Sequence, residues 1–204
     1  MATDIVIPEK ERWTYEDYMN LTPSDSFGFQ IIRGILVVSP SPKRRHQRTI
    51  LSLGRILDIY VNAHNWGEMF IAPFDVILDA DQPEPENIVQ PDLMFVSREH
   101  MDIVTDDNIQ GAPDLVVEVL SDSTARYDRV GKMSVYAEFG VKEYWILDTN
   151  AQFLESFDLT GAHPQLVASL GGDDVFKPEL FPDLEISLSD LWYPEKDDSD
   201  GKDT

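Results

Sequence analysis

Two acidic residues lie in apolar segments where a charge is unusual. Asp92 follows Pro91 at the start of one such segment, and Glu118 lies in the middle of another, Leu115-Val-Val-Glu-Val-Leu. Carboxylates are rarely buried unless a cation or a metal compensates them, because removing an isolated charge from water is costly. If the two segments are neighbouring strands, their carboxylate oxygens suit a hard cation, Mg²⁺ or Mn²⁺.

A lysine follows these acids at helical spacing. Asp128, Lys132 and Tyr136 are four residues apart and share one face of a predicted helix. If that face lies over the carboxylates, Lys132 could neutralise charge on a scissile phosphate or orient the attacking water. Other interpretations stay open: Glu118 in a buried salt bridge with Lys132, Lys132 paired with Asp128 on a solvated helix face, and Tyr136 as core packing.

A basic cluster precedes these residues. Lys43, Arg44, Arg45 and Arg48 lie within six positions. The first three fall in the first turn of a predicted helix, where the macrodipole disfavours a cation by about 0.3–1 kcal/mol each. We therefore expect the cluster to contact nucleic-acid phosphates. His46 lies on the apolar stripe of the same helix, so it is either a core histidine or a group that positions DNA or water.

The overall charge points the other way. The chain of 204 residues has a net charge of −22, which by itself disfavours a nucleic-acid binder. Residues 1–50 have a net charge of +1, with seven Lys/Arg against six Asp/Glu, and the rest of the chain has −23. The distribution therefore leaves one local positive region. Cysteine is absent, and neither a signal peptide nor an apolar run of about 18 residues is found, so we expect a cytoplasmic protein without a membrane span.

The hydrophobic pattern predicts a mixed sheet flanked by helices, an α/β (α+β) fold. A single domain spans residues 1–192, and an acidic tail, 193–204, is predicted to be disordered. The N-terminal part contains a short helix capped by Thr14 and a hairpin that turns at Arg33-Gly34. The other predicted elements are a helix over 42–64 capped by Ser41 with Pro42 in its first turn, strands over 68–79, 89–96, 114–120 and 143–148, a helix over 124–139 ending near Gly140, and antiparallel strands near 152–158 and 164–169.

Four segments together resemble a known family. They are Pro91-Asp92, Pro113-Asp114-Leu-Val-Val-Glu-Val-Leu-Ser121, Tyr127-Asp-Arg-Val-Gly-Lys-Met-Ser-Val-Tyr136, and Gly140-Val-Lys-Glu-Tyr-Trp-Ile-Leu-Asp148. The chain resembles a restriction-endonuclease family of small bacterial proteins within the PD-(D/E)XK nuclease superfamily, from about Tyr15 to Trp192. The resemblance implies a restriction-endonuclease-like core and Mg²⁺-dependent cleavage of DNA, with Asp92 and Glu118 as metal ligands.

Two positions depart from the superfamily pattern. A lysine is expected two residues after the second acid, where this chain has Leu120, and the resemblance suggests that Lys132 replaces it. Similar sequences often carry Glu before the hairpin turn, where this chain has Gln30, which offers an oxygen but no charge. Asp75 is a further candidate acid on an adjacent strand, and Asp114 is expected to be a capping or turn residue.

The sequence leaves three functions open. The first is a metal-dependent DNA endonuclease, which we expect to act as a homodimer because cleaving both strands needs two active sites. The second is a binding module that keeps the nuclease fold without catalysis, favoured by the charge of −22, Gln30 and Leu120. The third is a phosphodiesterase acting on RNA or a small nucleotide. The predicted core accounts for the whole chain and no separate recognition domain is evident, so a nuclease that cleaves a specific DNA sequence would require a partner protein.

Overall fold

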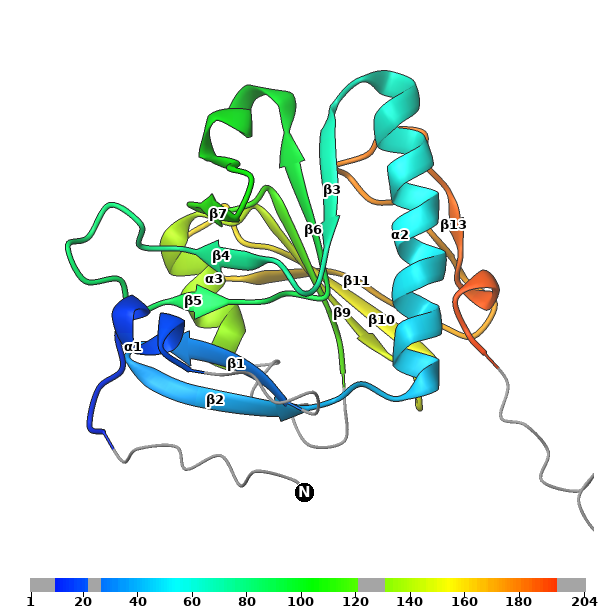
Figure 1. Ribbon diagram of the computed structural model, residues 1–204. Helices are drawn as coiled ribbons and strands as arrows, with labels where there is room; N and C mark the ends of the chain where they lie inside the picture. Colours follow the sequence, from blue (N-terminus) through cyan, green and yellow to red (C-terminus); the bar gives the residue numbers. More distant parts are fainter. Residues whose placement is uncertain (1–9, 22–26, 121–130, 194–204) are drawn as a thin grey trace, which may run out of the picture.

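The computed structural model describes residues 10–21, 27–120 and 131–193, in which strands hold more residues than helices (Figure 1). The helices are α1 (Tyr15–Met19), α2 (Arg44–His64), α3 (Met133–Phe139) and the 3-10 helices η1 (Arg98–Ile103) and η3 (Leu188–Asp190). The strands are β1 (Phe27–Ile32), β2 (Ile35–Pro40), β3 (Gly67–Ile71), β4 (Asp75–Ile77), β5 (Ile88–Val89), β6 (Leu93–Ser97), β7 (Asn108–Gln110), β8 (Leu115–Val119), β9 (Glu143–Asp148), β10 (Phe153–Asp158), β11 (Gln165–Gly171), β12 (Val175–Phe176) and β13 (Ile186–Ser187).

The described strands form two mixed sheets and a small antiparallel pair, β12-β13. The six-stranded sheet has the order β11-β10-β9-β8-β6-β3, and only β8 and β9 run parallel in it. The five-stranded sheet has the order β2-β1-β5-β4-β7, with β4 and β7 parallel. The mixed α/β class is therefore confirmed, whereas the prediction of one central sheet is wrong.

Proline explains why the predicted long strands are divided between the two sheets. The predicted strand 68–79 is interrupted at Pro73, so β3 belongs to the six-stranded sheet and β4 to the five-stranded one. The predicted strand 89–96 is interrupted at Pro91 between β5 and β6. Proline has no N–H to continue a ladder. The chain therefore crosses twice between the sheets at neighbouring places, where the Ala72 N–H donates to the Asp92 carbonyl at 3.2 Å.

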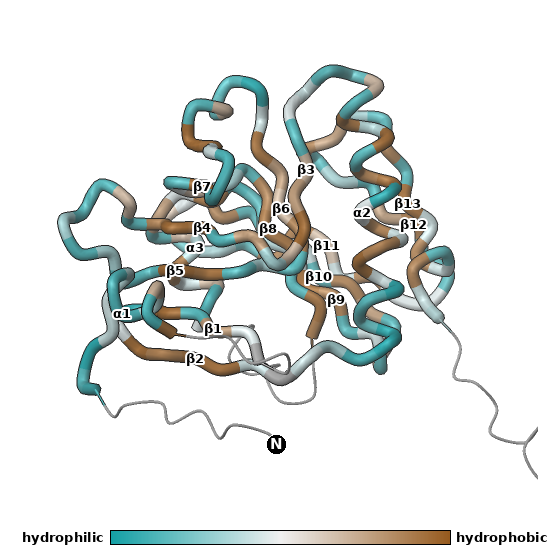
Figure 2. Tube along the Cα trace, in the orientation of Figure 1, coloured by the Kyte–Doolittle hydropathy of each residue, from teal (hydrophilic) through white to brown (hydrophobic). Residues whose placement is uncertain are grey.

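The core fills both faces of the six-stranded sheet. Side chains alternate along β8, so Leu115, Val117 and Val119 face α2, while Val116 packs with α3 and the five-stranded sheet. Figure 2 shows hydrophobic residues along the central strands and at intervals along α2. The predicted apolar stripe of α2 is confirmed, because its buried positions include Ile50, Leu53, Leu57 and Val61. Glu118 lies on the α3 side of this sheet, within an otherwise apolar layer.

Local signals decide the ends of the elements. Thr14 caps α1 with a reciprocal capping box to Asp17, and Gly140 ends α3 in the left-handed conformation, both as predicted. The hairpin turn at Arg33-Gly34 has positive φ at both residues, the geometry of a tight type I′ turn. The start of the predicted helix 124–139 and nearly all of the predicted disordered tail lie outside the described residues.

The predicted start of the long helix is wrong. Lys43 is the N-cap, with an extended backbone and no hydrogen bond from its side chain to the helix, and α2 begins at Arg44. Ser41 and Pro42 therefore precede the helix rather than cap and open it. No acidic residue lies in the first turn. The two arginines there face the positive end of the macrodipole without a compensating carboxylate in that turn.

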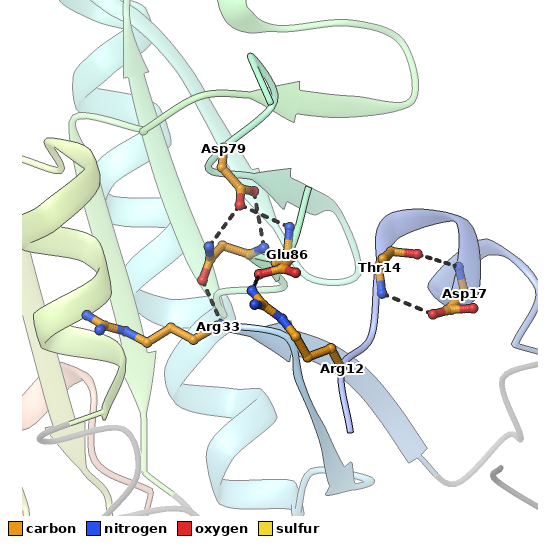
Figure 3. Close-up of polar contacts among 7 residues, drawn as sticks. Arg12, Thr14, Asp17, Arg33, Asp79 and Glu86 are labelled. Carbon is orange, nitrogen blue, oxygen red and sulfur yellow. Dashed lines mark hydrogen bonds and ion pairs between the residues drawn. The ribbon is translucent and has the colours of Figure 1, made fainter. Parts of the chain in front are cut away.

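A polar network ties the hairpin to the loop before β5 (Figure 3). Asp79 accepts hydrogen bonds from the backbone N–H groups of Glu86 and Asn87 at 2.9 and 3.1 Å. The Asn87 amide oxygen accepts the Arg33 N–H at 2.8 Å, and Arg12 forms an ion pair with Glu86. These contacts fix β1 beside β5, which brings the Gln30 side chain to Gln90, two residues before Asp92.

Asp114 lies just before the first residue of β8, whereas Asp92 contacts the last residue of that strand, Val119. Its buried carboxylate accepts hydrogen bonds from the Ser97 N–H at 2.7 Å and His100 Nδ1 at 2.9 Å, and pairs with Lys142 Nζ at 2.6 Å. Burial favours a higher pKa, but Lys142, Ser97 and His100 outweigh it and lower the pKa of Asp114 below its ordinary 3.8. Asp114 therefore joins η1, β6, β8 and β9 at a distance from the candidate site.

We predict that Asp114→Asn lowers the free energy of unfolding by about 1–3 kcal/mol at pH 7, because a charged acceptor is lost while its partners can rehydrate. His100 and Lys142 are nearly half-exposed, with 43% and 46% of their side chains accessible. A depressed folded pKa stabilises the protein above the unfolded value of about 3.9, and this contribution is lost as pH falls through the folded value. Urea unfolding from pH 7 to 2 measures it. A difference between variant and wild type that is unchanged at low pH would contradict the assignment.

None of the helices within residues 10–21, 27–120 and 131–193 combines the length and the apolar character needed to cross a bilayer.

Candidate functional site

Asp92 and Glu118 lie at opposed backbone positions where the chain passes from the five-stranded to the six-stranded sheet. The antiparallel pair β6-β8 matches Leu93 with Val117 and Met94 with Val116. One position further, this register sets Asp92 opposite Glu118. The Asp92 Oδ2 atom accepts the Val119 N–H at 2.7 Å, which fixes the carboxylate against β8. The structure therefore places the two acids on neighbouring strands, as the sequence predicts.

Glu118 has two buried polar partners from α3 and the turn before it. Lys132 Nζ donates to Glu118 Oε1 at 2.8 Å, and the Tyr136 hydroxyl donates to the same oxygen at 2.8 Å. Glu118 and Lys132 are each 4% exposed, and Tyr136 is fully buried. A carboxylate is tolerated in this apolar layer because a cation and a hydroxyl replace its hydration. Tyr136 is thus both a core residue and a hydrogen-bond donor to Glu118, whereas the sequence favours core packing alone.

His46 reaches Asp92 from the first turns of α2. Its Nε2 lies 3.2 Å from Asp92 Oδ2, and its side chain is only 12% exposed. His46 Nδ1 is buried and has no hydrogen-bond partner among the described residues. Asp92 therefore meets an imidazole on one side and a backbone amide on the other. His46 ends the apolar stripe of α2 as a partly buried residue and contacts a candidate site acid, while its role in positioning DNA or water stays a prediction.

The two carboxylates control the protonation of His46. Burial favours a lower pKa, but the contact with Asp92 and the negative charges of Asp92 and Glu118 outweigh it, with a smaller contribution from the Val119 backbone, and raise the pKa of His46 above its ordinary 6.5. A raised folded pKa stabilises the fold fully below the unfolded value, and this stabilisation is lost as pH rises through the folded one.

We predict that the His46 ring titrates above pH 6.5 in metal-free protein, and that Asp92→Asn lowers its pKa, since the substitution removes the nearest negative charge. NMR of the ring protons across pH 5–9 measures both values, and His163, on an exposed loop, is an internal reference. An unchanged His46 pKa in the variant would separate the ring from Asp92.

A second polar group lies next to the Pro91-Asp92 junction. The Tyr18 hydroxyl and Gln90 Nε2 both donate to Asp75 Oδ1, at 2.8 and 2.7 Å. The Gln90 backbone N–H donates to Gln30 Oε1 at 3.3 Å. Asp75 and Gln30 thus approach the candidate site through Gln90. Sequence reasoning identified Asp75 and Gln30 but missed Gln90, whose only sequence signal is its place two residues before Asp92.

The predicted basic cluster lies at the start of α2, beside His46. Arg45 Nη1 contacts Asn150 Oδ1 at 3.2 Å. Arg48 donates to the Tyr193 hydroxyl at 2.7 Å, and its guanidinium lies 4.4 Å from the Tyr193 ring centre. Arg55 extends the basic side of the helix, because positions 45, 48, 52 and 55 share one face. We call Lys43, Arg44, Arg45, Arg48 and Arg55 the α2 basic face.

The structure brings Asp92, Glu118, Lys132 and His46 together, with the basic face beside them and Asp114 excluded. Asp128 lies outside the described residues. Within the described ranges, no group of three or more His, Cys, Asp or Glu side chains is arranged to hold a metal ion. The protein therefore offers two carboxylates, Asp92 and Glu118. One or two carboxylates are what Mg²⁺ sites in phosphate-processing proteins commonly provide, with water and substrate phosphate as further ligands.

Comparisons with known proteins cover most of the chain. The Uma2 family model, described as “Putative restriction endonuclease”, matches residues 15–189. The protein sll1609 of Synechocystis sp. is 24% identical over 174 residues, 83% of this chain and 94% of that protein. A crystal structure of a putative nuclease belonging to DUF820 from Anabaena variabilis matches with a TM-score of 0.70 and 15% identity, over 88% of this chain and 97% of that chain. At this identity, the structural likeness establishes the fold.

Proposed function

Because the chain belongs to the Uma2 family, we propose that it is a divalent-metal-dependent nuclease that hydrolyses DNA phosphodiester bonds at Asp92 and Glu118. The two sheets and their helices then correspond to a restriction-endonuclease-like core. The observation that supports this function best is the pair of acids at opposed backbone positions, Asp92 directly before β6 and Glu118 in β8, with Lys132 and His46 held against them. All cations of the α2 basic face except Arg55 lie within one turn of His46, and the face would hold the phosphate backbone.

Mg²⁺ or Mn²⁺ fits this donor set. Asp92 and Glu118 supply hard carboxylate oxygens and would hold the ion, and Gln30 offers a neutral oxygen nearby. A bound divalent ion supplies Lewis-acid chemistry, activating water and polarising a phosphoryl oxygen. Lys132 lies against Glu118, where its ammonium would stabilise negative charge that develops on the phosphate. His46 and the Val119 N–H orient Asp92.

The direct test is cleavage by the wild-type chain. Supercoiled plasmid, linear duplex, single-stranded RNA and a small-nucleotide phosphodiester are incubated with Mg²⁺, Mn²⁺ or EDTA. We expect nicking of DNA that needs a metal and stops with EDTA. Preference for RNA or for the small nucleotide would identify another phosphodiesterase. Sedimentation in the same buffers tests the homodimer that we propose for cleavage of both strands.

We predict that Arg44→Ala with Arg45→Ala weakens binding of a short duplex by about tenfold at low salt. The salt slope should fall by about one for each phosphate that the variant no longer neutralises. Binding is measured by fluorescence anisotropy in Ca²⁺ or EDTA over several salt concentrations. A matched double variant, Arg98→Ala with Lys177→Ala, removes two cations outside the α2 basic face. An equal weakening in both variants would mean that overall charge, not this face, determines affinity.

A binding module without catalysis is the second candidate. One observation favours it: Lys132 and Tyr136 already satisfy Glu118 Oε1, as in a purely structural buried pair. Calorimetric titration with Mg²⁺ and Mn²⁺ separates the two candidates. Heat of binding that disappears in Asp92→Asn supports the metal site. The absence of binding at millimolar metal supports the module.

A further inference from the structure

The chain returns to the α2 basic face at the end of its described part. Thr49 Oγ1 donates to the Leu191 carbonyl at 2.9 Å and is buried. Two residues later the Tyr193 hydroxyl lies 2.7 Å from Arg48 Nη2 and 3.3 Å from Ser52 Oγ. The Arg48 guanidinium covers the Tyr193 ring at 4.4 Å, a cation–π geometry. These interactions with neighbouring turns of α2 fix the point from which residue 194 continues.

The residues that follow have the charge opposite to that of this face. Segment 194–204, Pro-Glu-Lys-Asp-Asp-Ser-Asp-Gly-Lys-Asp-Thr, contains five acids and two lysines, a net of −3. The α2 basic face contributes five cations, and its first turn holds no acid. Hydrogen bonds from Ser52 and Arg48, with the charges of Arg48 and Arg55, lower the pKa of the Tyr193 phenol. The anchor itself therefore lies in a positive environment.

Segment 194–204 is long enough to span the α2 basic face. Arg44 is four residues from Arg48 and Arg55 is seven, which at 1.5 Å per residue is about 6 and 10 Å along the helix. Eleven residues reach at most about 36–40 Å. The acids of the segment can therefore together reach every cation of the face. Single exposed ion pairs are weak, but tethering raises the local concentration of the acids to the millimolar range.

We propose that the acidic segment 194–204 binds the α2 basic face and competes there with nucleic acid. The competition rests on the proposed function, whereas the contact between segment and helix does not. The acids would take the positions of backbone phosphates, so that a polyanion must displace them to bind the face. A DNA affinity set by this competition agrees with a basic face in a chain of net charge −22.

The contact is tested first, without nucleic acid. In the full chain, a carbodiimide joins an amine to a carboxylate only where the two are in contact, and peptide mass spectrometry identifies the pair. We expect Lys43 joined to an acid of 195–203 at low salt, with loss of the product near 1 M salt, where the Debye length falls to about 3 Å. Absence of that product at low salt would overturn the contact.

The competition is tested by neutralising the acids in the full chain. One variant changes Glu195, Asp197, Asp198, Asp200 and Asp203 to amides. The matched control changes five exposed acids outside the face, Asp81, Glu99, Asp102, Asp106 and Asp107, which lie on loops or in η1. Both variants have a net charge of −17, from −22 plus five. Two acids of the control lie in η1, whose Arg98 donates to the Asn65 carbonyl at the C-terminal end of α2, the end opposite Arg44.

We expect the segment variant to bind a fluorescent duplex about tenfold more tightly than wild type at low salt, with the difference vanishing at high salt. The control should gain less than about threefold, since its acids do not occupy the face and repel the duplex only from a distance. Equal gains in both variants, or none in the first, would overturn the competition. If no variant binds the duplex while the Lys43 product forms, the proposed function fails and the contact stands.

Discussion

Glu118→Gln is expected to lower metal-stimulated plasmid cleavage by about 10³-fold or more, with the chain still folded. Removing a carboxylate that holds the metal forfeits several kcal/mol of stabilisation of the transition state, and about 4 kcal/mol corresponds to a factor of 10³. The amide keeps the size of Glu118 and an oxygen for the Tyr136 hydroxyl, which donates at 2.8 Å in the wild type. Initial rates of nicking in Mg²⁺ and Mn²⁺, with folding verified by circular dichroism, measure the effect.

Loss of stability must be separated from loss of chemistry in this experiment. Glu118→Ala also removes the acceptor of Lys132 and Tyr136, both buried, so we expect it to unfold more easily than Glu118→Gln. Asp114→Asn is the matched control, because Asp114 is a buried carboxylate paired with a lysine away from the site. It should lose stability and retain cleavage. Equal nicking by Glu118→Gln and wild type would exclude Glu118 from the chemistry.

Asp92 gives an independent test. Asp92→Asn leaves the Lys132–Glu118 pair unchanged, because Asp92 contacts His46 and the Val119 N–H instead. A comparable loss of cleavage with a smaller loss of stability is expected. Agreement between the two variants would assign the effect to the carboxylate pair rather than to the packing of α3.

The sequence predicted the elements best where local signals and burial agree. The uninterrupted apolar run around Glu118 identified β8 as a central strand, and Thr14, Gly140 and the Arg33-Gly34 turn marked element boundaries correctly. It failed where a long-range partner decides. Pro73 marks a break in the predicted strand, but nothing local shows that the residues on either side of it belong to different sheets, because that assignment depends on which strands lie alongside.

The candidate site follows the same rule. Asp92 and Glu118 were identifiable because an acid in an apolar strand needs a partner, and Lys132 because of helical spacing. Tyr193 and Gln90 were not, since their partners, Arg48 and Asp75, are distant in the sequence and their own neighbours carry no pattern. Sequence thus identifies groups that require compensation, while the fold determines what compensates them.

Lys132→Met should lower the free energy of unfolding by about 3–5 kcal/mol, because it leaves Glu118 buried without its cation. Lys132 and Glu118 are each 4% exposed, so water cannot readily replace the lost partner. The double variant Glu118→Gln, Lys132→Met replaces the ion pair by neutral groups of similar size and should recover most of the loss. Urea unfolding of the two single variants and the double variant completes the cycle. Additive losses would mean that the two groups do not interact in solution.

The same cycle, repeated with metal, decides between a structural pair and a metal site. A ligand that binds only the folded state stabilises it according to its concentration and affinity. If Glu118 holds a divalent ion, millimolar Mg²⁺ should restore part of the stability of Lys132→Met, since the ion supplies the missing positive charge. It should restore none in the double variant, which has no carboxylate at position 118. A Mg²⁺ effect equal in both would place metal binding elsewhere and leave Glu118 and Lys132 as a structural ion pair.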